Sequence, residues 1–285
     1  MQAARTDNGT TDTPKPIYNP NMARILTIAN NKGGVGKTTT AVSMGAALRL
    51  RGFDVLVIDY DGQANTTETL RVPTYGGTTY DAMKQRTTPY ITPVRVLDTQ
   101  GGTCGVLDVL PACIDVSALE TELSNQPDRL TRFSNLVAKY RDKYDIVIVD
   151  TPPTLGLLTI SALYATDELI VTVQPQYLAV KGLLTLYDTI GKIDENRADP
   201  IRSRILFTQY DRRKGLHRLT ADEVAAAGFK VYDTKIRDNV ALGEAPAAGL
   251  DIFRYNARSN GAADYDALVD EYLNGRKLRH VKHRY

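Results

Sequence analysis

Short apolar runs recur along the chain and alternate with longer stretches of mixed polarity. The runs are RILTIA (24–29), DVLVID (54–59), GVLDVLPA (105–112), DIVIVD (145–150), ELIVTV (168–173) and SRILFT (203–208). Several of them are apolar at consecutive positions. Strands covered on both faces of a parallel sheet show this pattern, because neither face meets water. The runs therefore predict the strands of a parallel sheet.

Helical patterns fill the segments between these runs. Ala41, Met44 and Leu48 recur at spacings of three and four residues, and Gly52 is suited to end their helix. Further helices are predicted over 118–140, 178–193, 219–227 and 262–273. The alternation indicates an α/β fold with a doubly wound, mostly parallel sheet and helices on both faces. Right-handed crossovers place the ligand site of such a fold at the carboxyl ends of the strands.

Both ends of the chain and one internal region depart from this alternation. Residues 1–22 are rich in Thr, Asn, Asp and Pro, which predicts a flexible N-terminal extension. Residues 23–275 are expected to form one domain, followed by a basic C-terminal tail over 276–285. Prolines and glycines break the periodicity between 71 and 105, which indicates a loop-rich insertion.

Composition narrows the class of protein. The 285 residues are 42% hydrophobic, which is enough for a sizeable core. The chain has 35 Lys and Arg residues and 33 Asp and Glu residues, so its net charge is only +2. Any affinity for nucleic acid must therefore come from a local basic patch. Two cysteines are too few for a disulfide framework. With no apolar run near the roughly 18 residues of a membrane span and no apolar signal core, a cytoplasmic protein is expected.

A glycine-rich segment, NNKGGVGKTTTA (30–41), lies between the first predicted strand and the first predicted helix. Glycines let successive backbone N–H groups turn toward one anion at a helix N-terminus. Lys37 is suited to neutralise phosphate charge, and the Thr38 hydroxyl to bind Mg²⁺, as in the Walker A loop. A glycine turn that binds nothing is the alternative. We predict a site for ATP and Mg²⁺ formed by Gly33, Gly34, Val35, Gly36, Lys37, Thr38 and Thr39.

The loop departs from the common G-x-x-x-x-G-K-[ST] pattern, because Asn31 replaces the first glycine and Lys32 follows it. In this form, KGGVGKTTT resembles the deviant Walker A motif of the ParA/MinD ATPases, whose additional lysine is called the signature lysine. VLVIDYDGQANTT resembles the switch region of that family and YDIVIVDTPPTLGLLTISAL its Walker B segment. FTQYDRRKG and NVALGEAPAAG resemble two C-terminal stretches. The resemblance covers residues 23–273 and is closest to the ParA partition proteins.

The resemblance implies a homodimer in the ATP-bound state. Lys32 cannot easily fold back onto phosphates that Lys37 already occupies, but it can reach into a facing subunit. There it would act like an arginine finger, adding positive charge at the transferring phosphoryl group. The alternative is a solvated lysine that assists nucleotide binding within its own subunit.

Three carboxylates are candidates for the chemistry. Asp59 and Asp61 end a predicted strand at alternate positions, so their side chains share one side, toward the phosphates. The family implies that Asp61 is needed for hydrolysis, by positioning the attacking water, with help from Asn65. Gly62 replaces the proline usual in the family, which is expected to loosen the switch. The alternative is an acidic pair in a solvated turn.

Asp150 closes another predicted strand and is expected to hold Mg²⁺ through water, together with Thr38. A capping aspartate on a buried strand is the alternative. Pro152 and Pro153 follow, and they fix an extended turn suited to a second switch beside the γ-phosphate.

Non-specific DNA binding is also implied by the resemblance. KIRDNVALGEAP has Asp238 and Ala241 at two positions where close relatives usually have arginine. DNA binding is therefore expected to use other Lys and Arg residues. The alternative is that these residues form an ordinary solvated basic surface. The candidates are Lys181, Arg212, Arg213, Lys214, Arg218 and Arg237, with Arg276, Lys277, Arg279, Lys282 and Arg284 in the tail.

The predicted function is an ATP-dependent partition ATPase that binds DNA non-specifically, associates with the nucleoid and is activated by a ParB-like or other adaptor. Positioning of a non-DNA cargo is an alternative. So is a MinD-like membrane-gradient ATPase, although the tail has too little apolar area for an amphipathic anchor and no stable membrane association is expected. The signature lysine argues against an ATP-dependent carboxylase or amidase. Cys104 and Cys113 are interpreted as ordinary thiols, although the iron protein of nitrogenase shares this fold.

Overall fold

The computed structural model describes residues 22–84, 92–93, 105–177 and 179–274. Its sheet has the strand order β3-β4-β2-β5-β1-β6-β7. Each of the six predicted apolar runs forms a strand, and these strands are all parallel. Their bounds are Arg24–Ala29 (β1), Val55–Asp59 (β2), Leu107–Leu110 (β4), Ile146–Asp150 (β5), Glu168–Val173 (β6) and Arg202–Phe207 (β7). A short strand, β3 (Thr92–Pro93), pairs antiparallel with β4 at one edge.

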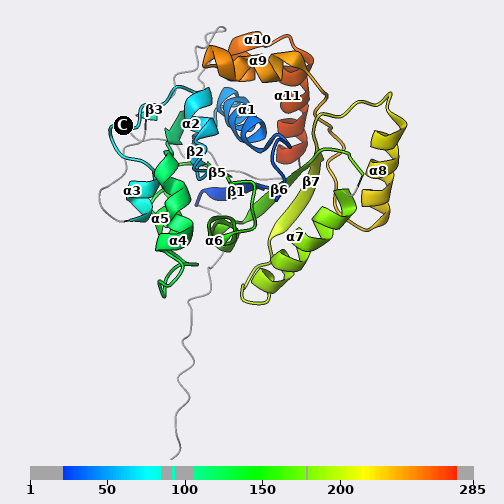
Figure 1. Ribbon diagram of the computed structural model, residues 1–285. Helices are drawn as coiled ribbons and strands as arrows, with labels where there is room; N and C mark the ends of the chain where they lie inside the picture. Colours follow the sequence, from blue (N-terminus) through cyan, green and yellow to red (C-terminus); the bar gives the residue numbers. More distant parts are fainter. Residues whose placement is uncertain (1–21, 85–91, 94–104, 178, 275–285) are drawn as a thin grey trace, which may run out of the picture.

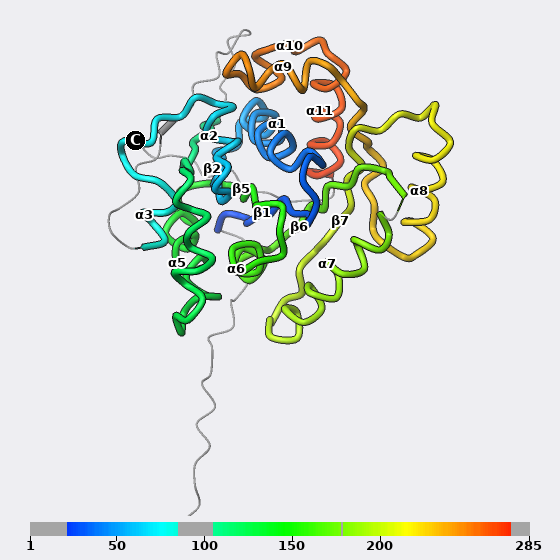
Figure 2. The backbone as a smooth tube through the Cα atoms, viewed as in Figure 1, coloured from blue at the N-terminus to red at the C-terminus, as the bar shows by residue number. Residues whose placement is uncertain are grey.

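Helices cover both faces of the sheet (Figure 1). One face carries α1 (Lys37–Leu50), α2 (Asn65–Thr69), α9 (Val240–Ala248), α10 (Ile252–Asn256) and α11 (Asn260–Leu273). Figure 2 shows α1 enclosed between the sheet and this C-terminal group of helices. The opposite face carries α3 (Thr79–Met83), the 3₁₀ helix η1 (Ile114–Ala118), α4 (Leu119–Glu122), α5 (Arg132–Ala138), α6 (Leu157–Ala165) and α7 (Ala179–Asp194), with α8 (Gly215–Ala226) beside α7.

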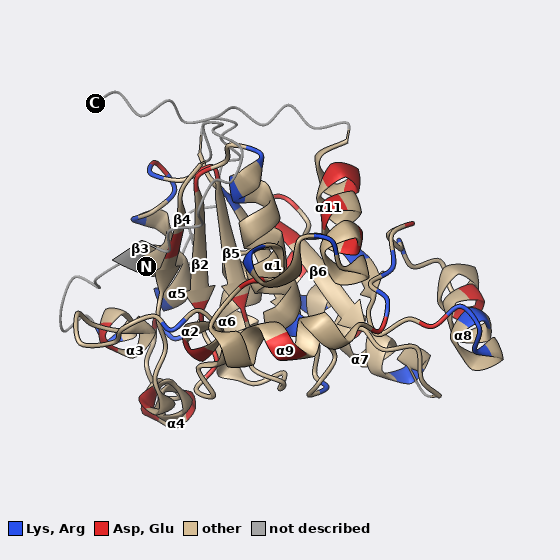
Figure 3. Ribbon diagram, turned by 90° about the horizontal axis from the view of Figure 1, so that it is seen from above, with Lys and Arg blue, Asp and Glu red and all other residues tan. Residues whose placement is uncertain are grey.

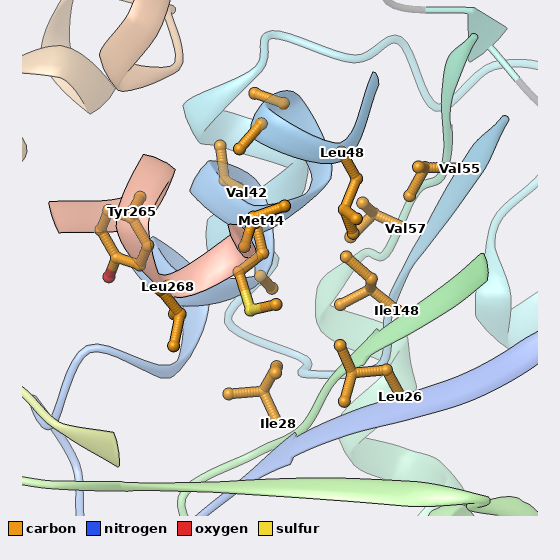
Figure 4. Close-up of a cluster of buried hydrophobic side chains, with 14 of the residues drawn as sticks. Leu26, Ile28, Val42, Met44, Leu48, Val55, Val57, Ile148, Tyr265 and Leu268 are labelled. Carbon is orange, nitrogen blue, oxygen red and sulfur yellow. The ribbon is translucent and has the colours of Figure 1, made fainter. Parts of the chain in front are cut away.

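Consecutive strand residues enter different cores, which explains why the runs are continuously apolar. Leu26 and Ile28 pack in the cluster that contains α1 and α11, whereas Ile25 lies in the cluster on the opposite face. In Figure 4, Met44 of α1 projects toward Leu26 and Ile28, and Leu268 of α11 lies beside it. The doubly wound α/β architecture predicted from the sequence is confirmed.

The predicted helix over 118–140 is wrong as a single element. Its ends form α4 and α5, and turns occupy the residues between them. Pro127 lies in that gap; it has no N–H to donate and disfavours helical geometry at Gln126. The described part of the predicted insertion over 71–105 contains a short helix, α3. Its N-terminus has a capping box, in which Asp81 accepts a hydrogen bond from the backbone N–H of Thr78 at 2.9 Å.

Among the described residues, five α-helices were not predicted from the sequence: α2, α3, α6, α9 and α10. Three of them have only five residues each, which is too short for a helical period to show. Among the described residues no helix is both long and apolar enough to cross a membrane. The predicted extension over 1–22, apart from Met22, and the tail over 276–285 lie outside the described residues.

The register of the central strands brings the polar residues at the carboxyl ends of these strands together on one side of the sheet. Asp59 of β2 pairs in register with Asp150 of β5, and Ile28 near the end of β1 pairs with the same aspartate. The glycine-rich loop leaves β1 at this edge and leads into α1. The loop and the candidate carboxylates therefore converge where a ligand site of this fold is expected.

Truncation of Met44 tests the packing of α1 on the sheet. Met44 is fully buried, so Met44→Ala leaves a cavity, and we expect the free energy of unfolding to fall by about 3 kcal/mol. Leu50→Ala is the control on the same helix, because Leu50 is 38% exposed. Urea denaturation followed by circular dichroism measures both changes. Equal losses for the two variants would contradict this description of the core.

Candidate nucleotide and metal site

The loop between β1 and α1 owes its path to glycines at two positions. Gly34 and Gly36 have φ angles of 72° and 78°, a region that side-chain-bearing residues rarely adopt. Gly36 lies at the N-cap of α1 and accepts the first helical bond, from the N–H of Thr40 at 2.9 Å. The following N–H groups at the start of α1 have no helical acceptor, which makes this end attractive to an anion.

Side chains beyond β7 hold the backbone of the loop. The Thr208 hydroxyl donates to the Val35 carbonyl at 2.9 Å, and the Gln209 amide donates to the Gly34 carbonyl at 2.8 Å. Gln174, which follows β6, donates in turn to Gln209 at 2.7 Å. Sequence reasoning missed these residues. Their signal was their place at or directly after the ends of predicted strands, and for Thr208 and Gln209 also the resemblance of FTQYDRRKG to a family segment.

Lys37 is buried within the site, with 7% of its surface exposed. Its Nζ donates to the Lys32 carbonyl at 3.1 Å. Burial lowers the pKa of Lys37, whereas the nearby charges of Asp150 and Asp61 raise it. The ammonium group is therefore held between the loop and two carboxylates. The role of Lys37 as the lysine that meets the phosphates stays a prediction.

Lys32 takes a different direction from Lys37. It is exposed, and its Nζ donates to the side-chain oxygen of Gln176, which lies after β6. Its backbone N–H donates to the Asn30 side chain at 3.0 Å. The two lysines of the loop therefore occupy separate environments, one buried among carboxylates and one at the surface.

Asp150 has the chemistry of a magnesium ligand. The Thr66 hydroxyl donates to its Oδ2 at 2.9 Å, whereas its buried Oδ1 has no hydrogen-bond partner in the part of the chain that the structure describes. Burial raises the pKa of Asp150 to about 6, against the opposing influence of Thr38, Thr66 and Lys37. Mg²⁺ prefers oxygen ligands, so an unpartnered carboxylate oxygen near the Thr38 hydroxyl fits it. Bound there, Mg²⁺ would neutralise phosphate charge.

Asp59 and Asp61 have different surroundings, although the sequence predicted the same orientation for both. Asp59 is fully buried and accepts hydrogen bonds from the Thr67 N–H at 2.8 Å and the Thr67 hydroxyl at 2.7 Å. Burial and the charge of Asp150 raise its pKa to about 8. Asp61 instead contributes to the charge around Lys37. Asp59 therefore anchors α2, and Asp61 is the carboxylate left near the loop.

The predicted second switch lies next to the loop. A Cβ added at Gly33 would lie 3.9 Å from the Cβ of Pro153, which is van der Waals distance, so the two segments are close neighbours. The Thr151 hydroxyl donates to the Ile28 carbonyl at 2.8 Å, which ties the start of this turn to β1. The turn after β5 therefore lies beside the loop, and its role as a second switch stays a prediction.

A cavity of about 230 Å³ opens beside the start of α1. Thr38 and Thr39 line it together with Asn65, which begins α2. Residues of α9 and α10 close the far side, among them Leu242, Pro246 and Ile252. Asn65, expected to assist the switch, thus lies near the predicted nucleotide-binding threonines.

The predicted DNA-binding lysines and arginines that the structure describes are all exposed, and two of them, Arg213 and Arg237, are paired with aspartates. Figure 3 shows Lys and Arg gathered around the start of α8. Lys181, Arg212, Lys214 and Arg218 are exposed there or on the neighbouring α7, as is Arg213, which is paired with Asp211 at 3.0 Å. By contrast, Arg237 donates to the buried carboxylate of Asp264 at 2.6 Å. The Lys and Arg residues of the C-terminal tail lie outside the described residues.

Of the two cysteines, the structure describes Cys113. Cys113 is a free, half-buried cysteine 3.6 Å from the Thr78 hydroxyl, and Cys104 lies outside the described residues. Within the described ranges, no group of three or more His, Cys, Asp or Glu residues is arranged to hold a metal ion.

Comparison with known proteins agrees with this geometry. A family model described as an AAA domain matches residues 23–203. The chromosome-partitioning ATPase Soj of Treponema pallidum is 36% identical over 259 residues, which is 88% of this chain and 98% of that protein. The chromosome partitioning protein ParA of Caulobacter vibrioides is 35% identical over 267 residues, covering 92% of this chain and 98% of that protein.

A solved structure extends the similarity to three dimensions. The cobyrinic acid a,c-diamide synthase of Mycobacterium smegmatis, with bound ADP and magnesium, is similar in structure to this chain, with a TM-score of 0.74. The match has 29% sequence identity and covers 92% of this chain and all of that one. A nucleotide and magnesium are thus bound in a protein of closely similar fold.

Separate substitution of the two loop lysines tests whether Lys37 serves nucleotide binding and Lys32 serves hydrolysis across a dimer. Because Lys37 lies inside the site, we expect Lys37→Ala to weaken nucleotide binding roughly 100-fold. We expect Lys32→Ala to bind ATP normally, to form a weaker closed dimer and to hydrolyse ATP on the order of 1,000-fold more slowly. Titration with a fluorescent ATP analogue and a phosphate-release assay measure these effects. Normal turnover by Lys32→Ala would contradict a role for this lysine across a dimer.

Substitution of Asp61 separates binding from hydrolysis. Asp61→Ala removes the carboxylate expected to position water and leaves Lys37, Thr38 and Asp150 in place. We therefore expect a long-lived ATP-bound dimer, seen by gel filtration with light scattering in ATP and Mg²⁺. A variant that stays monomeric in ATP would show that Asp61 has a structural role instead.

Proposed function

The chain belongs to the ParA/MinD family of ATPases, and we propose that it is a DNA-partition ATPase whose ATP-bound homodimer binds DNA without sequence specificity. Its enzymatic activity is ATP hydrolysis, with ATP and Mg²⁺ as cofactors. The names of the Treponema and Caulobacter relatives support a role in partition. We expect a ParB-like or other adaptor, bound to the transported DNA or another cargo, to stimulate hydrolysis.

The placement of Lys32 is the observation that carries this proposal. Lys37 and the carboxylates near it already balance charge within the loop, and Lys32 lies at the surface beside Gln176. An exposed cation at the mouth of a phosphate loop is available to a second subunit. Its charge would act most strongly in a site from which dimer closure removes water. ATP would then hold the dimer together, and hydrolysis would release it.

The exposed basic residues near α8 support the DNA-binding part of the proposal. Arg212 and Lys214 lie in the loop that leads into α8, and Arg218 lies one turn within it. A row of phosphates is a suitable partner for such a group because it needs only positive charge at loosely defined positions. Since Arg237 is paired with Asp264, we assign it a smaller share of the contact than the bases around α8. DNA binding of this kind would place the protein on the nucleoid.

Salt dependence and charge reversal test the DNA-binding surface together. Phosphate contacts release counterions, so affinity should fall steeply with salt and vary little between duplex sequences. We expect the double variant Arg212→Glu and Arg213→Glu to weaken binding and to reduce the slope of log affinity against log salt by about two. Basal ATP turnover should stay intact. Fluorescence anisotropy with labelled duplexes, in ATP and Mg²⁺, measures affinity and slope.

A matched double variant on the other side of the molecule provides the control. Arg129 and Lys139 are exposed residues that flank α5, and their replacement by Glu changes the net charge equally. Equal loss of DNA binding in both double variants would show that only overall charge matters. Failure of the wild-type protein to bind duplex DNA at low salt, with cosedimentation on anionic liposomes, would favour MinD-like membrane positioning. Turnover that requires a carboxylate substrate would favour an amidase.

A further inference from the structure

A short segment on the face opposite α1 lies against both parts of the chain that are expected to respond to nucleotide. We call residues 61–65 the first switch and residues 151–156 the second switch. The bridging segment, residues 114–122, consists of η1 and α4. It contacts each switch through a glycine, Gly62 on one side and Gly156 on the other.

Glu120 joins the bridging segment to the second switch. Its Oε2 accepts a hydrogen bond from the Leu157 N–H at 2.7 Å, and its Oε1 accepts one from the Leu158 N–H at 3.2 Å. These are the first two N–H groups of α6, whose own N-cap, Gly156, has no side chain to offer. A carboxylate at a helix N-terminus is also stabilised by the helix dipole. Glu120 therefore caps α6 from a different helix.

The contact at Gly156 depends on its lack of a side chain. A Cβ placed there would lie 2.4 Å from Glu120 Oε1, which would force the carboxylate away. The backbone at Gly156 is extended, with φ of −80° and ψ of −171°, so alanine is sterically allowed apart from that contact. Space for Glu120 is thus a specific reason for glycine at this position.

Gly62 provides the matching contact with the first switch. A Cβ built on it would lie 2.8 Å from the backbone nitrogen of Ser117, in η1. Because backbone cannot move aside as easily as a side chain, η1 and the first switch are packed with no room for a methyl group. The neighbouring residue of the switch is Asp61, the candidate water-positioning carboxylate.

These two contacts connect the groups that hydrolysis must bring together. The second switch lies beside the phosphate loop through Pro153, and the first switch carries Asp61. Geometry at a reacting centre is sensitive to displacements of about 1 Å, including those that arise from residues outside the site. We infer that Glu120 is a positioning residue for ATP hydrolysis, which fixes the second switch relative to the first through the bridging segment.

Glu122 offers a matched control in the same helix. Its carboxylate accepts hydrogen bonds from the Lys84 ammonium at 2.8 Å and the Tyr80 hydroxyl at 3.2 Å, so it connects α4 to the region of α3. Glu122→Ala therefore removes a carboxylate and an interhelical contact from α4 without touching α6. Loss of general stability in α4 is common to both variants, whereas loss of the α6 cap is specific to Glu120.

The experiment compares Glu120→Ala, Glu120→Gln, Gly156→Ala and Glu122→Ala in the full-length chain. For Glu120→Ala we expect kcat for ATP to fall about tenfold while KM and the affinity for MgADP change less than about twofold, because the phosphate loop itself is untouched. Amide hydrogen exchange at Leu157 and Leu158 should accelerate. Gly156→Ala should reproduce both effects. Glu120→Gln, which keeps an acceptor, should restore part of kcat, and Glu122→Ala should keep kcat at the wild-type level.

Two results would overturn the inference. The first is faster exchange at the start of α6 in Glu120→Ala with kcat unchanged, which would make the cap purely structural. The second is an equal fall of kcat in Glu120→Ala and Glu122→Ala. If Glu120→Ala does not fold, Gly156→Ala and Glu120→Gln decide the question by the same two measurements, since both keep a polar side chain at 120.

Discussion

The burial of one positive charge beside carboxylates is the constraint on which the rest of this site depends. Lys37 is almost completely covered, and Asp150 is fully covered. Removal of either charge from water is costly unless an opposite charge or hydrogen bonds compensate for it. The carboxyl end of the parallel sheet provides part of the compensation, because Asp150 ends β5 and Asp61 follows β2, and the charges of both carboxylates act on Lys37. The carboxylates also explain why α2 starts where it does, since Asp59 accepts two hydrogen bonds from Thr67.

The same charge arrangement separates the roles of the two lysines. The environment around Lys37 already contains two acidic groups and one loop carbonyl, so a second ammonium group there would add repulsion without a further partner. Lys32 lies outside that environment and bonds to a neutral amide, Gln176. An exchangeable contact of this kind is easily replaced by a stronger one, such as a phosphate carried by another subunit. Lys37 therefore has its charged partners within the subunit, whereas Lys32 is available to a partner outside it.

Features determined by local sequence were predictable, and those determined by distant packing were not. The strands and the phosphate loop carry their own signals, in consecutive Val and Ile residues and in glycines that permit positive φ. The break between α4 and α5 also had a local signal in Pro127, which the periodicity of the flanking residues outweighed in the prediction. The pairing of Arg237 with Asp264 joins residues 27 positions apart, and the cap of α6 by Glu120 joins residues 37 apart. Nothing in the neighbourhood of either residue in the sequence indicates such a partner.

Gly62 illustrates how a departure from a family pattern acquires a physical meaning only in three dimensions. Taken from the sequence, the replacement of proline by glycine suggests a looser switch, because glycine has more backbone freedom. In the folded chain that freedom is opposed by close packing, since the backbone of Ser117 leaves no space for a Cβ at this position. Proline would place such a carbon there, so it is incompatible with the bridging segment as it lies. Glycine at residue 62 thus makes the backbone of the switch less stiff, and it also allows η1 to pack closely against that backbone. Both effects follow from the absence of a side chain.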